Sequence, residues 1–286
     1  MPENGQDAVL LAARWGAATD VGRKRELNED SLLAAAPVFL VADGMGGHEA
    51  GEVASALVVE AFRPLVGRPL VGFRDLEDAV ALAARSVHGL ASAGQAPGST
   101  LTGVALSEHG GYPCCRVINI GDSRTYHLSE EGFSRVTTDH SEVQELVDLG
   151  IIDAATAAQL PQRNIITRAL GGALGPDVRA DHYLLPARSG DRFVVCSDGL
   201  SGELTEILIE IIARSNPDPQ QTAEALVEHA LLAGGRDNIS VIVVDIMEAV
   251  PQWPDSAVDE TTLGHEAEEA GEDTLPNPLR EVVEDA

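Results

Sequence analysis

Short apolar runs rich in β-branched residues alternate with longer amphipathic stretches over residues 8–248. The runs predict strands at Arg14–Thr19, Ser31–Ala42, Leu101–Leu106, Tyr112–Asn119 and Thr125–Leu128. Apolar residues at helical spacing predict helices at Ala50–Leu65, Asp75–Ala91, Glu203–Arg214 and Pro219–Ala233. Because runs of hairpins are interrupted by pairs of helices, the pattern predicts an α+β layered domain rather than a parallel βαβ fold.

Residues 139–170 interrupt this order. A helix is expected at Glu142–Leu149 and a weaker one at Ala154–Leu160, and the segment ends in Asn164–Arg168. Since it lies between strand-like blocks, we expect an excursion that covers part of the domain.

Acidic residues stand at the ends of several of the apolar runs. Asp43 follows Pro37–Ala42, Asp122 follows Val117–Ile120, Asp198 follows Phe193–Cys196, and Asp237 precedes Ile239–Val244. A short buried strand that ends in an acidic residue places a carboxylate at the rim of a sheet. Carboxylates gathered in one place repel each other unless cations lie between them. The sequence therefore predicts a site for hard metal ions.

Six short motifs carry these residues. They are Arg25-Glu26-Leu27-Asn28-Glu29-Asp30, Val41-Ala42-Asp43-Gly44-Met45-Gly46-Gly47-His48, Gly98-Ser99-Thr100, Gly121-Asp122-Ser123-Arg124, Ser197-Asp198-Gly199 and Asp237-Asn238-Ile239-Ser240. Each motif alone is a weak signal, but six in order are specific. In them the chain resembles the metal-dependent serine/threonine protein phosphatases of the 2C type (the PPM family), in their bacterial form, over roughly residues 12–247.

The resemblance implies a four-layer αββα sandwich of two mainly antiparallel sheets flanked by helices, with residues 8–248 as the catalytic domain. It also implies Mn²⁺ or Mg²⁺ as cofactor, with two ions and a third at a weaker site. By the resemblance, the ligands of the two ions are Asp43, the carbonyl of Gly44, Asp198 and Asp237, with Asp30 and Glu29 acting partly through water, and Asp122 serves the third ion with Asp198.

The implied activity is hydrolysis of phosphoserine and phosphothreonine in proteins by a hydroxide that bridges the metals, in opposition to bacterial serine/threonine kinases. Arg25 matches the position that grips the substrate phosphate, for which a planar guanidinium is suited. His48 is the candidate general acid for the leaving alkoxide. In animal members a histidine directly follows Asp-Gly, whereas here Met45 takes that place, as in other bacterial forms.

Structural explanations remain open for several of these residues. Asp122 could form an ion pair with Arg124, and Arg25 could belong to a solvated basic loop. His48 could cap or pack against the helix that follows it, Glu29 could be an exposed loop acid, and His140 is expected to be structural. A catalytically inactive family member that binds phosphoproteins is a second hypothesis, against which the intact acidic set argues. A metal-dependent hydrolase of small phosphoesters is a third, and it would share the chemistry that grips the phosphate.

The composition of the chain excludes some classes of binding partner. The chain of 286 residues has a net charge of −27, which argues against nucleic acid and anionic membranes as partners. The apolar runs are short of the roughly 18 residues of a membrane span, and the start lacks a basic signal-peptide region, so a cytoplasmic protein is expected. The three cysteines at positions 114, 115 and 196 lack metal-ligand spacing and are expected to be reduced structural thiols.

Two segments are expected to lie outside the catalytic core. Residues 139–170 correspond to the flap of bacterial family members and are expected to tune substrate access. Residues 249–286 hold eleven acidic side chains and one basic one, and we expect a disordered acidic tail. Thr261 and Thr262 in this tail could be phosphorylated and bound by a phosphothreonine reader, or the tail could simply aid solubility.

Overall fold

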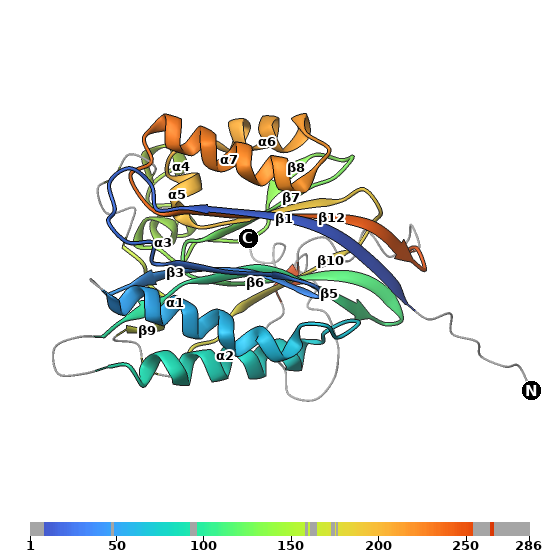
Figure 1. Ribbon diagram of the computed structural model, residues 1–286, viewed down its shortest axis with the longest axis horizontal. Coiled ribbons are helices and arrows are strands. Elements are labelled where there is room, and N and C mark those ends of the chain that lie inside the picture. Colours follow the sequence, from blue (N-terminus) through green and yellow to red (C-terminus); the bar gives the residue numbers. More distant parts are fainter. Residues whose placement is uncertain are drawn as a thin grey trace, which may run out of the picture.

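The protein is a sandwich of two antiparallel sheets between two layers of helices, as Figure 1 shows for the computed structural model. The structure describes residues 9–46, 49–91, 96–157, 160, 165–172, 175, 177–253 and 264–265. The four-layer α+β fold predicted from the sequence is confirmed.

The first sheet has the order β1-β12-β11-β7-β8. Its strands are β1 (Leu10–Asp20), β12 (Ile239–Val250), β11 (Arg192–Cys196), β7 (Arg124–Leu128) and β8 (Phe133–Arg135). Strand β1 pairs with β12 along its whole length, so the two ends of the domain lie side by side. Helices α6 (Glu206–Ser215) and α7 (Pro219–Ala233) cover its outer face (Figure 1).

The second sheet has the order β13-β10-β6-β5-β3-β4-β9, and β2 also pairs with β3. Its strands are β2 (Asp30–Ala35), β3 (Val38–Met45), β4 (Gly98–Ser99), β5 (Leu101–His109), β6 (Tyr112–Ile120), β9 (Leu170–Gly171), β10 (Asp181–Pro186) and β13 (Gly264–His265). Helices α1 (Glu49–Phe62) and α2 (Phe73–His88) lie on its outer face.

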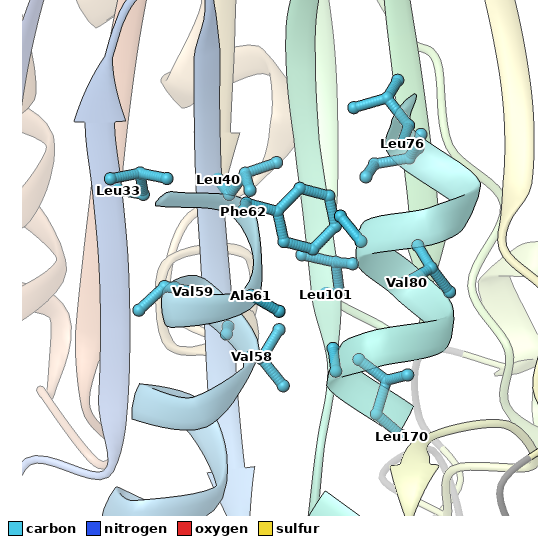
Figure 2. Packing of buried hydrophobic residues seen from close by; sticks show 14 of the residues in the cluster. Leu33, Leu40, Val58, Val59, Ala61, Phe62, Leu76, Val80, Leu101 and Leu170 are labelled. Carbon is cyan, nitrogen blue, oxygen red and sulfur yellow. The ribbon is translucent and has the colours of Figure 1, made fainter. Parts of the chain in front are cut away.

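Strand β3 is buried on both of its faces. Leu40 packs with Phe62 and Leu76 in the layer between this sheet and its helices, which Figure 2 shows at close range. Phe39 and Val41 instead belong to the cluster between the two sheets. This double burial explains why the strand reads as a continuous apolar run rather than an alternating one.

Several predicted element boundaries were wrong. The single strand expected at Ser31–Ala42 is two strands, β2 and β3, separated at Ala36-Pro37, because proline has no N–H for the strand ladder. Helix α1 ends at Phe62 and a 3₁₀ turn at Arg63–Leu65 follows it, with Pro64 inside that turn. Helix α6 begins at Glu206 rather than Glu203, because the Thr205 hydroxyl caps it by accepting from the Leu208 amide.

Residues 139–170 contain α3 (Glu142–Asp148) and, within their described part, α4 (Ala154–Ala157). The Ser141 hydroxyl caps α3, and an antiparallel bridge joins Ser141 to Ile166. The two ends of the segment therefore lie together where it leaves and rejoins the sandwich.

The C-terminal region continues past the expected boundary at residue 248. Strand β12 runs to Val250, and the Trp253 ring packs on Tyr112 with ring centroids 5.1 Å apart. Residues 264–265 pair with β10. Thr261, Thr262 and most of the acidic tail lie outside the described residues, so the expectations for them stay predictions. Within the described part of the chain, no helix is long and apolar enough to cross a membrane.

Candidate metal and phosphate site

Five aspartates from both sheets meet at one end of the sandwich. Asp43 lies near the end of β3, directly opposite Asp30 of β2 in the strand register. Asp122 follows β6, Asp198 is the first residue of α5 (Asp198–Ser201), and Asp237 precedes β12. The Asp43 carboxylate interacts electrostatically with the other four carboxylates. The fold therefore brings these side chains together, as the sequence predicted.

Burial and mutual proximity raise the pKa values of four of these carboxyl groups, those of Asp30, Asp43, Asp122 and Asp198. Burial, followed by the charge of Asp198, raises the pKa of Asp122 to about 8, and it raises that of Asp30 to about 7 against hydrogen bonds from serines. Burial and Asp237 raise the pKa of Asp198 to about 6. Burial and the charge of Asp30 raise the pKa of the Asp43 carboxyl well above its ordinary range. The cluster thus favours charge-compensating ligands.

Four acidic side chains of the site have a buried oxygen without a hydrogen-bond partner among the described residues. These atoms are Glu29 Oε1, Asp30 Oδ1, Asp122 Oδ1 and Asp198 Oδ1. Buried carboxylate oxygens without partners are costly unless a cation binds them. The residues therefore fit a hard divalent ion.

Within the described ranges, no three acidic, histidine or cysteine side chains form a complete ligand group for one ion. Mg²⁺ and Mn²⁺ bind oxygen ligands, and Mg²⁺ typically keeps several of its waters and takes only one or two carboxylates from the protein. A site with few carboxylates per ion is thus compatible with these metals.

The backbone around Asp43 is fixed from two sides. The Thr100 hydroxyl accepts from the Asp43 amide at 3.0 Å, and the Thr100 amide donates to the Asp43 carbonyl at 2.9 Å. At Gly44 a Cβ atom would lie 2.1 Å from the Gly51 carbonyl oxygen, so any side chain there would force α1 away from β3. The glycine in the Asp-Gly motif therefore allows the close approach of α1 to the site.

Arg25 faces the acidic cluster. Its Nη2 lies 2.9 Å from Asp237 Oδ2, and its Nη1 lies 3.7 Å from Glu29 Oε2. Burial opposes its charge, but Asp237 and Glu29 outweigh this and raise the pKa of the guanidinium. Arg25 is therefore a half-exposed residue that pairs with acidic side chains at the edge of the site, in a loop whose other basic residues are exposed, and its contact with a substrate phosphate stays a prediction.

Asn238 holds the loop that carries Arg25 and Glu29. Its Oδ1 accepts from the Glu29 amide at 2.8 Å, and its Nδ2 donates to the carbonyls of Val21 and Leu27, each at 2.9 Å. The Asp30 carboxylate is placed in turn by the Ser197 hydroxyl, which donates to its Oδ2 at 2.8 Å.

A cavity of about 720 Å³ opens beside these carboxylates. Asp122, Asp198 and Asp237 line it together with residues of α3 and of the α5–α6 region, among them Val143, Gln144, Leu204 and Glu206. Segment 139–170 thus forms one wall of the cavity next to the acidic site.

The alternative ion pair of Asp122 with Arg124 is wrong. The Arg124 guanidinium pairs with Asp139 through Nε at 2.9 Å and Nη2 at 2.6 Å. Asp122 Oδ1 is left without a hydrogen-bond partner in the described structure, and the nearby charges of Asp198 and Asp139 raise the pKa of this carboxyl more than that of Arg124 lowers it.

His140 has a structural position, as expected. Its Nδ1 accepts from the Gly121 amide at 3.0 Å and its Nε2 lies 2.9 Å from Asp181 Oδ2. It therefore links the base of segment 139–170 to the turn that carries Asp122.

Two residues of the site, Thr100 and Asn238, were not predicted from the sequence to have a role. One predicted residue, His48, lies outside the described residues. Thr100 and Asn238 position their neighbours. Thr100 belongs to a motif that was given no catalytic role, and Asn238 follows the predicted ligand Asp237 but was given no role of its own. Their strand and turn context was the available signal, but their partners are distant in the chain. His48, the candidate general acid, lies outside the described residues, so that role stays a prediction.

The chain is similar to known phosphatases in sequence. A sequence model described as Protein phosphatase 2C matches residues 22–230. The chain is 37% identical over 247 residues to the serine/threonine protein phosphatase PstP of Mycobacterium tuberculosis, covering 84% of this chain and 46% of that protein. It is 32% identical to the serine/threonine phosphatase stp of Listeria innocua, covering 79% of this chain and 93% of that protein.

Solved structures show the same fold. The crystal structure of the catalytic domain of PstP in complex with two manganese ions has a TM-score of 0.74 and 35% identity, covering 83% of this chain and 100% of that one. The Mycobacterium smegmatis phosphatase MsPP in complex with cacodylate has a TM-score of 0.73 and 38% identity, covering 83% and 99%. The chain spans about half the length of the M. tuberculosis relatives that it matches.

Proposed function

The chain belongs to the protein phosphatase 2C family, and on this premise we propose that it hydrolyses phosphoserine and phosphothreonine in proteins with the help of Mn²⁺ or Mg²⁺. The observation that carries the proposal is the set of buried carboxylate oxygens without partners on four acidic residues of the cluster, at whose edge Arg25 pairs with Glu29 and Asp237. Such a set fits metal ions, and a guanidinium beside it fits a phosphate.

The residues that would hold the ions follow from the site. Asp43, Asp198, Asp237 and the Gly44 carbonyl would hold two ions, with Asp30 and Glu29 acting partly through water. Asp122 would serve a third, weaker ion together with Asp198. When bound, such ions supply an activated water that can act as the attacking hydroxide, and they neutralise charge on the phosphoryl group. The PstP catalytic domain with two manganese ions supports this proposal by analogy.

Arg25 would bind and orient the substrate phosphate. Its guanidinium already sits at the edge of the carboxylate cluster, 2.9 Å from Asp237. Two of its N–H groups can contact two phosphoryl oxygens at once, which fixes the orientation of the scissile bond. His48, directly or through water, would donate the proton to the leaving alkoxide.

The substrate class follows from the relatives and not from the site alone. PstP and stp are named serine/threonine phosphatases, and we extend this to phosphorylated proteins, including serine/threonine kinases and their targets. Segment 139–170 would act as a flap that tunes access, which is supported by its place in the cavity wall. A cytoplasmic location and a phosphothreonine reader for the tail stay predictions.

Manganese-dependent release of phosphate from a phosphothreonine peptide tests the proposal. The wild-type chain should be active with Mn²⁺ and inactive after chelation, and Asp43→Asn should lose activity. Asp78→Asn on the exposed side of α2 is a matched control that should retain it. A wild-type chain that binds Mn²⁺ in calorimetry yet releases no phosphate from the peptide would contradict the proposal. If it released phosphate only from small phosphoesters, the protein substrate class would be wrong.

A further inference from the structure

An open groove lies on the outer face of α1, next to the Arg25 loop. Leu27, Val53, Ala56 and Leu57 form its apolar part, and Glu52 and Glu60 stand beside them, around a volume of about 500 Å³. Leu27 and Val53 are 45% and 44% exposed.

Leu57 packs partly against the core, but the other apolar side chains in this groove, Leu27, Val53 and Ala56, are exposed. Helix α1 buries its other face through Ala54, Val58 and Phe62 against β3 and α2. The opposite stripe of a surface helix is normally polar. Here Val53 and Ala56 lie on that stripe and are exposed, and Leu27 joins them from a different element. An exposed apolar patch built from two elements is typical of an interaction site.

The groove borders the loop that carries Arg25, the candidate phosphate-binding residue. Leu27 follows Arg25 by two residues, and the carbonyl of Leu27 accepts from Asn238 Nδ2. The Ser55 hydroxyl of α1 donates to the Glu29 carbonyl at 2.6 Å. Helix α1 and the Arg25 loop are therefore tied together at the same end of the sandwich, where Figure 1 shows the start of α1 and the loop after β1.

Three partners could fill this groove: the C-terminal segment of the chain, a second copy of the chain, or a segment of another protein. Their charges distinguish them. The segment 249–286 carries a net charge of −10, from eleven acidic residues and one basic one, and a second copy of the chain carries −27. Glu60 is paired with Arg63 at 2.6 Å, whereas Glu52 is exposed beside the apolar residues. A complementary occupant is thus apolar and basic, and neither the acidic tail nor a second copy fits this description.

We propose that the groove docks a segment of the phosphoprotein substrate away from the phosphorylated residue, with a bulky apolar side chain next to a lysine or arginine. The apolar side chain packs between Leu27 and Val53, and the basic group lies near Glu52. This inference rests on the proposed phosphatase activity for its role, but binding in the groove does not require catalysis.

The first experiment compares phosphothreonine peptides that share one core. One carries Leu-Lys extensions on both sides of the core, and the other carries Gly-Ser extensions of equal length. The wild type should have a KM about tenfold lower for the Leu-Lys peptide, because one apolar side chain becomes buried. Val53→Arg should remove this difference and leave kcat and the KM for the Gly-Ser peptide in place. Leu82→Arg, at an exposed leucine of α2, is the matched control and should keep the difference.

The second experiment measures binding without turnover. Fluorescence anisotropy of the Leu-Lys peptide lacking phosphate should show saturable binding to the wild type and to Leu82→Arg, but not to Val53→Arg. Glu52→Gln should weaken this binding, whereas Glu228→Gln on α7 should not. Equal binding to all of these variants, or equal KM values for the two peptides with the wild type, would overturn the docking groove. Absent turnover with the expected pattern of binding would instead count against the proposed phosphatase function.

Discussion

Two sets of buried carboxylates in this molecule differ in what lies opposite them. Asp245 of β12 is met by Arg192 Nη2 at 2.8 Å and by Arg14 Nε at 3.1 Å. Arg192 Nε donates to the other oxygen of this carboxylate, Asp245 Oδ1, at 2.5 Å, and its Nη1 donates to the Ala213 carbonyl at 2.6 Å. Asp198, in contrast, lies among Asp43, Asp30 and Asp237, and its Oδ1 has no partner in the described structure.

The difference separates a structural ion pair from a ligand site. Both carboxylates are withdrawn from water, so burial alone does not distinguish them. Around Asp245 the protein supplies the opposite charge itself, and the charge balance is complete on folding. Around Asp198 the like charge of Asp237 and burial outweigh the charges of Arg25 and Arg124, so the balance is completed only by a cation that binds.

The largest expected effect comes from neutralising a carboxylate of the unbalanced set. Asp198→Asn should lower kcat/KM for a phosphothreonine peptide by about a hundredfold to a thousandfold or more, since charge on the reacting group is no longer compensated. The metal-free variant should be at least as stable as the metal-free wild type, because a like charge is removed. Chemical unfolding in the presence of a chelator measures this, and a clear loss of metal-free stability would contradict the comparison.

A substitution in the ion pair of Asp245 with Arg192 should have the opposite effect, on stability rather than on activity. Arg192→Met removes one of the two arginines that pair with the buried Asp245 carboxylate and leaves only Arg14 beside it. The free energy of unfolding should fall by about 3–5 kcal/mol. The activity per folded molecule should be retained, because this pair lies away from the cavity beside Asp198. The double variant Arg192→Met with Asp245→Leu should recover part of the lost stability. Lost activity in a fully folded single variant would break the distinction.

The stability of the metal-free protein should depend on pH with opposite signs in two regions. The raised pKa values of Asp30, about 7, and Asp122, about 8, mean that the folded form binds more protons than the unfolded chain. Their contribution is therefore present at low pH and is lost as pH rises from about 4 to 8. The pKa of Asp181 is lowered despite burial, by His140 and Arg168, so its contribution is lost as pH falls below the ordinary value of 3.8.

Thermal unfolding across this range tests the signs. The midpoint of the chelator-treated protein should fall between pH 5 and pH 8 by on the order of 5 °C. Saturating Mn²⁺ should reduce or reverse the fall, because bound cations favour the ionised carboxylates. A thermal midpoint of the metal-free protein that rises between pH 5 and pH 8 would show that repulsion between the carboxylates does not destabilise the folded form.

The smallest expected effect concerns the support of Asp43. Thr100→Val keeps the side-chain shape but removes the hydroxyl that accepts from the Asp43 amide and lies 2.8 Å from the Ser123 hydroxyl. We expect a loss of about 1–3 kcal/mol of stability, because a buried N–H is left unpaired. Activity should fall by about tenfold, as for other residues that orient ligands. Thr100→Ser, which keeps the hydroxyl, should behave like the wild type in both measurements.

The sequence predicted the parts of the fold whose signal is local. Helix α7 was expected at Pro219–Ala233 and has these bounds, because Pro219 at its first turn and the apolar spacing are local features. Strand β8 was not predicted, because its three residues are ordered by pairing with β7 rather than by their own pattern. The break at Ala36-Pro37 was missed because the apolar character continues across it.

Taken alone, the sequence determined which residues would gather as a charged centre, since Asp43, Asp122 and Asp198 each follow a buried run and a buried run must end at the rim of its sheet. Only the tertiary structure decided which charges are compensated. Arg124 lies two residues from Asp122, yet it pairs with Asp139, and Arg25 meets Asp237 from 212 residues away. Pairing depends on the side-chain directions and loop positions that the packed sheets impose, and no local pattern encodes these.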